Sequence, residues 1–344
     1  MTFDFIVIGA TGEQGSIASR DLLESGYRVL LCGRRRSAVK TLLKKHKRAR
    51  FAEVDLRNID STTRVIRKAG SPIVLNCAEL TWNLNAMDAC LKAQAHYLDL
   101  GGLQDMTVRQ FKRNRAFERK GLIALLGCGS TPGIANVMAA HAIADMDVVD
   151  HIDLGFAWKS NMKTFVLPYS LESIVYELTV PAIVLENGRF KKIRACTLEG
   201  ITRFLGVGKQ ATYCIVHSEV FTFHRYFKHL GLRSVHYKAG FPHHSSSVIE
   251  ILIELGFVSK APVATPSGDI VPLDFTSSAL RDIKRPKKYK ETEDLWVSVY
   301  GTSKGKPTRI QMDCLVKSTP GWGEAGSNVD TGRTIAVMAE MLHH

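Results

Sequence analysis

A glycine-rich turn directly after a short apolar run is the feature that most limits what this sequence can fold into. The run covers residues 3–8, and Gly9, Gly12 and Gly15 follow it before a segment with helical spacing. In this order of strand, turn and helix, one glycine permits the tight turn, another lets the backbone approach a pyrophosphate, and the third lets helix and strand pack closely. The pattern predicts a dinucleotide-binding turn, with a purely structural turn as the alternative.

The turn departs from the usual spacing at one position. It reads GxxGxxG rather than GxGxxG, so Thr11 stands where the middle glycine usually stands. A glycine triplet alone is weak evidence, but its place between strand and helix strengthens it. The predicted cofactor contacts in the turn are Gly9, Thr11, Gly12, Glu13, Gln14 and Gly15.

The first 130 residues alternate short apolar runs with helical segments, which is typical of βαβ units and a parallel sheet. Continuously apolar runs are typical of strands that are buried on both faces. We therefore predict an α/β fold class, with a Rossmann-type doubly wound sheet in residues 1–130 that binds its ligand beyond the carboxyl ends of the strands. Strands are predicted at residues 3–8, 27–32, 50–54, 73–76, 97–100 and 122–126.

The pattern changes after about residue 148. Residues 149–158 alternate as an antiparallel strand does, and Asn187-Gly188 stands between two strand-like runs, as in a β-hairpin. A second hairpin is predicted in residues 295–317. We predict an α+β domain in residues 131–330, built on an antiparallel sheet, and a C-terminal helix within residues 331–344 that joins the first domain.

Charge and composition limit the partners of this chain. The net charge is +13, and much of it lies in basic runs at residues 34–50, 109–120 and 281–290. Few aromatic residues interrupt these runs, so we predict a solvated basic surface rather than a specific nucleic-acid site. The sequence shows no apolar stretch of about 18 residues and no signal peptide. Its seven cysteines lack regular spacing, so we expect a cytoplasmic protein with reduced thiols and no membrane partner.

Arginines follow the second predicted strand, where NAD-binding folds usually carry an acidic residue for the ribose hydroxyls. They are Arg34, Arg35 and Arg36. Guanidinium groups make charge-assisted, bidentate contacts with phosphate, whereas unpaired cations are unfavourable at a helix N-terminus. The sequence therefore favours NADP(H), contacted by Arg34 and Arg35, with NAD(H) as the other option. A basic helix N-terminus that faces water is the alternative interpretation.

Two further strand ends are predicted to contact the cofactor. Asp55 and Leu56 follow the third strand, where the adenine is expected. Asn76, Cys77 and Ala78 follow the fourth strand, where the nicotinamide ribose is expected. The alternatives are a cap or turn role for Asp55 and a loop-turning role for Asn76.

Longer motifs resemble a known family. HYLDLGGL (residues 96–103), GCGSTPGIANVMAAHA (residues 127–142) and HSE (residues 217–219) occur in an order and spacing similar to the saccharopine dehydrogenase family, in particular its lysine 6-dehydrogenase-like branch. The resemblance covers nearly the whole chain. It implies NAD(P)-dependent hydride transfer at an amine-bearing carbon of an amino acid. It also implies a second domain that mediates dimerisation, so a homodimer is expected.

One position departs from the family pattern. Saccharopine reductases look like GLDPG where residues 129–133 of this chain read GSTPG, so Thr131 replaces a carboxylate. A threonine cannot hold a substrate ammonium by charge, which disfavours saccharopine as the substrate. The lysine branch commonly uses NAD, whereas the arginines after the second strand favour NADP.

Oxidising an amine requires a base within hydrogen-bond reach of the reacting group. Asp99 is a catalytic candidate because it stands at the end of the fifth predicted strand, which is expected to face the nicotinamide. His217 is the other, because imidazole titrates near neutral pH. The alternatives are that Asp99 accepts backbone N–H groups of the glycine turn and that Ser218-Glu219 caps a helix. The predicted substrate contacts are Gly101, Thr131 and Glu219.

Two other functions stay open. One is an amine-forming reductase of the saccharopine or carboxynorspermidine type, which members of the family achieve by reductively joining an aldehyde to an amine. The other is an NADP-binding redox sensor that regulates a partner without turnover. Asp99, the second domain and the HSE motif favour an enzyme with a small amine or amino-acid substrate. His243-His244 lacks further ligands at metal spacing, so no metal site is predicted.

Overall fold

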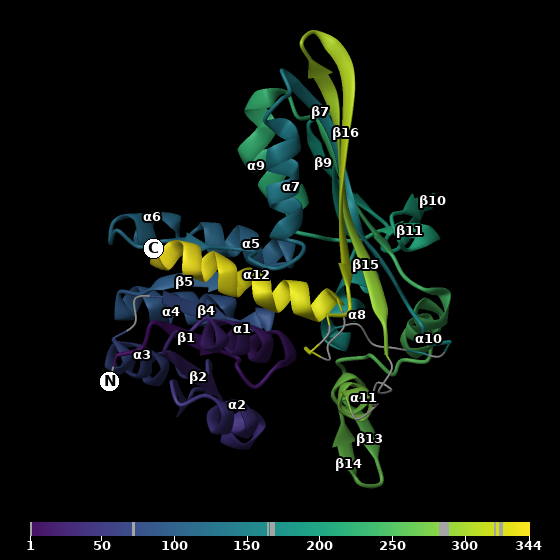
Figure 1. The fold of residues 1–344 in the computed structure, drawn as a ribbon. Helices are drawn as coiled ribbons and strands as arrows, with labels where there is room; N and C mark the ends of the chain where they lie inside the picture. Colours follow the sequence, from purple (N-terminus) through teal and green to yellow (C-terminus); the bar gives the residue numbers. More distant parts are fainter. Residues whose placement is uncertain are drawn as a thin grey trace. The chain divides into compact units, whose positions relative to one another are not determined.

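The computed structural model describes residues 2–70, 73–163, 165, 169–281, 289–319, 321–322 and 326–344. Residues 282–288, within the third basic run, lie outside the described residues. The chain divides into two compact units (Figure 1): unit 1 is Met1–Met138 with Asn328–His344, and unit 2 is Ala139–Ser327.

Unit 1 is built on a sheet whose described strands all run parallel, in the order β3-β2-β1-β4-β5-β6. This is the order of a doubly wound Rossmann sheet, which confirms the predicted fold class. Every residue of β1, β2 and β4 is buried, and this explains the continuous apolar runs in the sequence. The strands are β1 (Phe5–Ile8), β2 (Val29–Gly33), β3 (Ala49–Glu53), β4 (Ile73–Asn76), β5 (His96–Asp99) and β6 (Ala124–Leu125).

Helices cover both faces of this sheet, and an apolar core lies under each layer. One core includes Ile6, Ile66 and Met87, and therefore lies under α3 and α4. The other includes Val7, Leu22 and residues of α12. The helices are α1 (Glu13–Glu24), η1 (Arg36–Val39), α2 (Lys40–Lys45), α3 (Ile59–Ala69), η2 (Leu80–Trp82), α4 (Asn83–Ala93), α5 (Gln104–Phe111), α6 (Asn114–Glu118) and α12 (Gly326–His343). Helix α7 (Ile134–Ile143) begins in unit 1 and ends in unit 2.

The C-terminal helix α12 packs directly on α1 within unit 1 (Figure 1, yellow). The buried amide of Asn328 accepts a hydrogen bond from Gln14 Nε2 at 2.7 Å and donates one to Glu13 Oε1 at 2.8 Å. Further along, a Cβ added at Gly332 would lie 2.7 Å from Ile17 Cβ. The two helices therefore approach each other so closely that only glycine fits at this position.

Unit 2 contains an eight-stranded sheet in the order β10-β11-β12-β7-β15-β16, to which β8 and β9 attach through β12. Its strands and helices are β7 (Val148–Ser160), α8 (Leu171–Thr179), β8 (Ala182–Glu186), β9 (Arg189–Ile193), β10 (Thr197–Phe204), β11 (Gly208–Cys214), α9 (Glu219–Phe227), η3 (Lys228–Leu230), β12 (Ser234–Gly240), α10 (His243–Glu254), β13 (Val263–Thr265), β14 (Gly268–Ile270), α11 (Pro272–Arg281), β15 (Glu291–Ser303) and β16 (Lys306–Lys317).

Both predicted hairpins are confirmed. Asn187 and Gly188 join β8 to β9 with positive φ angles, and Lys304 and Gly305 join β15 to β16 in the same way. The sheet differs from the prediction in one pairing, because β12 runs parallel to β7. Alternation of apolar and polar residues along a strand indicates which side chains face the core. It does not indicate whether a strand distant in the sequence pairs with it in the parallel or the antiparallel direction.

The contact between α12 and α1 predicts a destabilising substitution. Gly332→Ala forces a methyl group against Ile17 and the carbonyl oxygen of Gln14. We expect it to lower the free energy of unfolding of unit 1 by about 1–3 kcal/mol, despite the better helix propensity of alanine. Val337→Ala on the exposed side of the same helix is the control, and should change it by less than about 0.5 kcal/mol. Urea unfolding measures both, and equal stabilities would contradict the prediction.

Candidate functional site

The glycine turn between β1 and α1 forms a cradle of closely packed backbone. Gly9 has φ +82°, and a Cβ added there would lie 2.6 Å from the backbone nitrogen of Ala78. A Cβ at Gly15 would overlap the carbonyl oxygen of Gly9. At Gly12, by contrast, an added Cβ would meet only Gly9 O, at 3.3 Å. The turn is therefore closed on the protein side and open at Gly12, next to the N-terminus of α1, which suits a pyrophosphate.

Thr11 packs against the end of β2. A Cβ added at Gly33 would lie 2.7 Å from Thr11 Cγ2, so the threonine side chain occupies the space that Gly33 leaves. The remaining predicted residues of the turn, Glu13 and Gln14, hold Asn328 of α12. Their side chains therefore fix the C-terminal helix, and their backbone N–H groups lie in the first turn of α1.

The predicted contacts after β4 lie close to the glycine turn, but the side chain of Asn76 is buried. The backbone of Cys77 and Ala78 packs against Gly9. The Asn76 side chain donates hydrogen bonds to Asn83 Oδ1 at 2.9 Å and to the hydroxyl oxygen of Tyr97 at 3.3 Å. Burial raises the pKa of the Cys77 thiol to about 12. At this strand end, the backbone rather than the Asn76 amide borders the cradle.

Among the predicted cofactor contacts after β2 and β3, the charged side chains reach solvent and Leu56 does not. Arg34 and Arg35 are exposed between β2 and η1. Asp55 forms an ion pair with Arg57, and Arg34 lies close enough to lower the pKa of the same carboxyl further. Leu56 is buried in the core, and its carbonyl oxygen accepts a hydrogen bond from Asn85 Nδ2 at 2.9 Å.

Asp99 is fully buried at the end of β5 and is surrounded by donors. Its carboxylate accepts hydrogen bonds from Gln110 Nε2 at 2.5 Å, Tyr97 Oη at 2.9 Å and Asn83 Nδ2 at 3.2 Å. The backbone N–H of Gly127 donates to it at 2.9 Å. Burial raises the pKa of Asp99, and the hydrogen bonds partly offset this effect. These contacts fit the alternative role, in which Asp99 holds glycine loops.

The loops after β5 and β6 pack tightly against each other. Gly101 has φ +62°, and a Cβ there would lie 2.7 Å from Gly127 Cα. In the second loop, the Ser130 hydroxyl lies 3.0 Å from that of Thr331 on α12. Thr131 follows in the same loop and is partly exposed. The predicted substrate contacts of unit 1 therefore lie on loops that Asp99 and α12 both hold in place.

His217 and Glu219 of unit 2 form a buried acid–imidazole pair. Nδ1 of His217 is hydrogen-bonded to the carboxylate of Glu219, which also accepts a hydrogen bond from the Ser218 hydroxyl at 3.2 Å. The imidazole stacks on the ring of Tyr237, with centroids 4.0 Å apart. Burial alone would lower the pKa of His217, but the negative charge and hydrogen bond of Glu219 raise it. The structure thus brings the two predicted residues together.

The sequence interpretation missed a second carboxylate beside this pair. Glu177 on α8 is buried, and burial raises its pKa to about 7 despite the opposing influence of His217. Tyr169 donates a hydrogen bond to it at 2.5 Å. In the sequence, Glu177 is an acidic residue among the apolar residues of a short helix. Helix positions that face solvent produce the same pattern, so the sequence does not distinguish a buried carboxylate from an exposed one. We refer to Glu177, His217 and Glu219 as the acid–imidazole cluster.

The thiol of Cys128 is not placed as a nucleophile. Cys128 is buried, and desolvation raises the pKa of its thiol well above the ordinary value. Within the described ranges, no three His, Cys, Asp or Glu side chains are grouped to hold a metal ion. In the same part of the chain, no helix is both long and apolar enough to cross a bilayer.

Comparison with known protein families shows which family this chain belongs to. Residues 5–125 match the saccharopine dehydrogenase NADP binding domain, and residues 129–344 match the saccharopine dehydrogenase C-terminal domain. The chain belongs to the saccharopine dehydrogenase family. It therefore carries the NADP(H)-binding domain of an oxidoreductase family, and the cradle at Gly12 suits that cofactor.

Individual relatives agree with this assignment. Carboxynorspermidine synthase of Vibrio alginolyticus is 23% identical over 244 residues, which cover 67% of this chain but only 58% of that enzyme. Carboxyaminopropylagmatine dehydrogenase of Synechocystis is 23% identical to this chain. The matched region covers 80% of this chain and 71% of that enzyme. The structure of saccharopine dehydrogenase (L-Glu forming) from Saccharomyces cerevisiae has a TM-score of 0.73 at 11% identity, and the match covers 98% of this chain and 90% of that one. This last likeness shows the shared fold.

The open position at Gly12 predicts a selective loss of cofactor binding. Gly12→Ala is compatible with the extended backbone there, but its methyl group occupies the space next to the N-terminus of α1. We expect NADPH to bind about tenfold more weakly or worse, as for a lost charge-assisted hydrogen bond, with an unchanged melting temperature. Gly15→Ala should lower the melting temperature as well. Calorimetric titration with NADPH and thermal unfolding test both, and unchanged NADPH affinity in Gly12→Ala would contradict the cradle.

The hydrogen-bond donors around Asp99 predict that this residue stabilises the fold rather than acting as a general base. Asp99→Asn replaces an acceptor oxygen by an NH₂ group, which leaves at least one buried donor without a partner, at a cost of about 1–3 kcal/mol for each. We expect a clear drop in melting temperature, whereas Asp60→Asn at an exposed ion pair should have little effect. A stable Asp99→Asn variant that binds NADPH but has lost turnover would instead support Asp99 as the general base.

Proposed function

We propose that this protein is an NADP(H)-dependent reductase. Its substrate is the imine that an amine and an aldehyde form with loss of water, and its product is a secondary amine that carries a carboxyl group. The names of the relatives, carboxynorspermidine synthase and carboxyaminopropylagmatine dehydrogenase, support this amine-forming alternative over lysine 6-dehydrogenase activity. The observation that carries the proposal is the acid–imidazole cluster of unit 2, because reducing an imine requires a proton donor. A homodimer with a small-molecule amine substrate is part of the same proposal.

The cluster has the features of a proton donor. Glu219 holds Nδ1 of His217, so Nε2 is the atom through which the imidazole exchanges a proton. The negative charge of Glu219 raises the pKa of His217, which keeps the ring protonated at higher pH. Stacking on Tyr237 fixes the plane of the ring. In this proposal, His217 would supply the proton for the imine nitrogen, and NADPH would supply the hydride for the imine carbon.

Glu177 adds a second, tunable charge. Because its pKa is about 7, it is partly protonated at neutral pH, and in its ionised form it raises the pKa of His217 further. The hydrogen bond from Tyr169 holds its carboxyl group in place. We therefore infer that Glu177 is a positioning residue that modulates His217. Asp99 acts as a positioning residue in unit 1, through the loops that bear Gly101 and Thr131.

A direct assay tests the proposed reaction. Absorbance of the reduced cofactor is followed with NADPH and NADH, using diamines and agmatine as amines and carboxyl-bearing aldehydes as partners. We expect NADPH oxidation that requires both the amine and the aldehyde. Lysine with NADP⁺ or NAD⁺ tests the lysine 6-dehydrogenase alternative. A protein that binds NADPH but turns over with no pair would support the redox-sensor alternative and contradict the enzyme.

Substitutions in the acid–imidazole cluster test the role of His217. His217→Gln should lower kcat by about 10²–10⁴-fold, the usual contribution of a general acid, and leave NADPH affinity unchanged. Glu219→Gln removes the charge that raises the pKa of His217, so the imidazole loses its proton at lower pH. The alkaline limb of the kcat profile should therefore move to lower pH. His229→Gln, at an exposed position in η3, is the control, and a fully active His217→Gln variant would rule out this role.

A further inference from the structure

Asp55 is a carboxylate at the end of β3, the strand next to β2, and an NADP-binding domain is expected to accept the 2′-phosphate at the end of β2. Val54 donates a backbone hydrogen bond to the carbonyl oxygen of Gly33 at 3.2 Å, so the loops after β2 and β3 begin side by side. The side chain of Asp55 is 38% exposed. An unpaired carboxylate here would weaken the attraction of the neighbouring Arg34 for the 2′-phosphate of NADP(H) by electrostatic repulsion.

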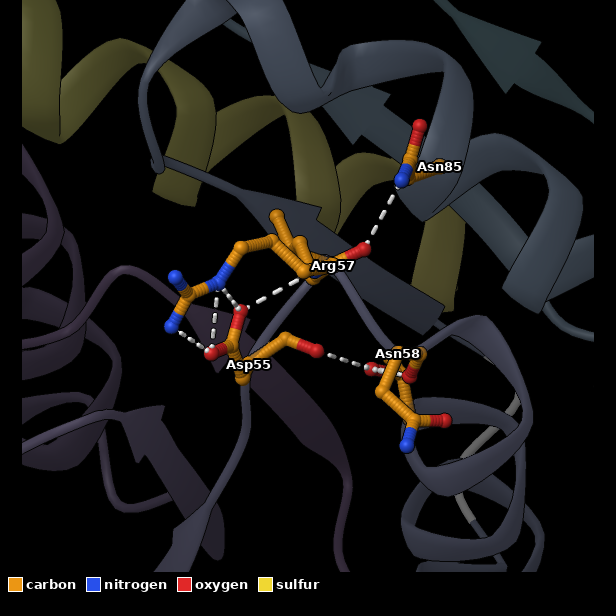
Figure 2. A network of polar contacts seen from close by, with 6 residues as sticks. Asp55, Arg57, Asn58 and Asn85 are labelled. Carbon is orange, nitrogen blue, oxygen red and sulfur yellow. Dashed lines mark hydrogen bonds and ion pairs between the residues drawn. The ribbon is translucent and has the colours of Figure 1, made fainter.

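Arg57 clamps this carboxylate. Nε of Arg57 lies 3.0 Å from Asp55 Oδ1 and 2.9 Å from Oδ2, and Nη2 also donates to Oδ2 (Figure 2). The backbone N–H of Arg57 donates to Oδ1 at 3.0 Å. These contacts, with a smaller contribution from Arg34, lower the pKa of Asp55 to about 2. The two positive charges of Arg57 and Arg34 therefore outnumber the one carboxylate of Asp55, and the local charge at this edge is positive.

The clamp leaves part of Arg57 available. Its side chain is 66% exposed. Among the contacts of the described residues, none engages Nη1, which carries two of the five guanidinium donors. A guanidinium that binds a carboxylate through one edge can thus present its other N–H groups to an anion.

The backbone that carries the clamp is held on both sides. Asn58 donates a backbone hydrogen bond to the carbonyl oxygen of Asp55 at 2.9 Å, and its side chain caps α3 by accepting one from Ser61 N. On the other side, Asn85 of α4 donates to the carbonyl oxygen of Leu56 (Figure 2). The loop is therefore preorganised, and little conformational entropy is lost when a ligand binds to it.

We propose that Arg57 is a cofactor-specificity residue, which neutralises Asp55 and, together with Arg34, holds the 2′-phosphate of NADP(H). Neutralising the carboxylate removes the repulsion, and the free Nη1 donors make a charge-assisted contact with the phosphate. The inference concerns cofactor binding alone and does not depend on the substrate of the enzyme.

The test compares binding of NADPH and NADH by calorimetric titration, with 2′,5′-ADP and 5′-AMP as fragments that isolate the phosphate. Arg57→Gln should weaken the binding of NADPH and 2′,5′-ADP by about 10- to 100-fold, which corresponds to about 1.4–2.7 kcal/mol and is typical of a charge-assisted contact. The binding of NADH and 5′-AMP should stay unchanged or become tighter. Arg64→Gln removes the same charge from an exposed position on α3 and should preserve the preference. An equal loss for both dinucleotides in Arg57→Gln would overturn the proposal.

A double variant separates the two actions of Arg57. In Asp55→Asn/Arg57→Gln, the repulsive carboxylate is gone, so NADPH affinity should recover part of the loss seen in Arg57→Gln. Complete recovery would overturn the direct phosphate contact, and no recovery would overturn the neutralisation. Cofactor binding is compared only between variants that remain folded. The melting temperature of each variant is therefore measured first.

Discussion

A buried carboxylate must be surrounded by donors, and this requirement at Asp99 organises the cofactor edge of unit 1. Tyr97 of β5, Asn83 of α4 and Gln110 of α5 all donate to it, together with the backbone of Gly127. A single desolvated group thus ties the end of β5 to two helices and to the loop after β6. Because a buried charge without partners is costly, these elements are held in one arrangement.

The shape of the glycine turn at this edge follows from the close approach of its backbone to neighbouring backbone segments. Gly9 and Gly15 leave no room for side chains on the protein side of the cradle, whereas the cradle is open at Gly12. Helix α12 reinforces the arrangement from the distant end of the chain, through Asn328 on the first turn of α1 and Thr331 on the loop after β6. In the proposed mode of cofactor binding, phosphate specificity then depends on the charges after β2 and β3.

Local patterns predicted the elements well and the partners of individual side chains poorly. The parallel sheet of unit 1 and both hairpins follow from apolar periodicity and from turn residues such as Asn187-Gly188. The parallel pairing of β12 with β7 does not, because strand direction depends on connections rather than alternation. The hydrogen bond between the buried amides of Asn76 and Asn83 likewise shows only in the folded structure.

The sequence by itself determined the family, the dinucleotide-binding turn and the excess of cations after β2, because these features lie in short contiguous segments. The tertiary structure decided which charges meet. It paired Asp55 with Arg57, brought Glu177 of α8 next to His217, and enclosed Asp99 among donors from three elements. Burial and pairing govern proton affinity and anion binding, and both depend on residues that are distant in the sequence and become neighbours only when the chain packs.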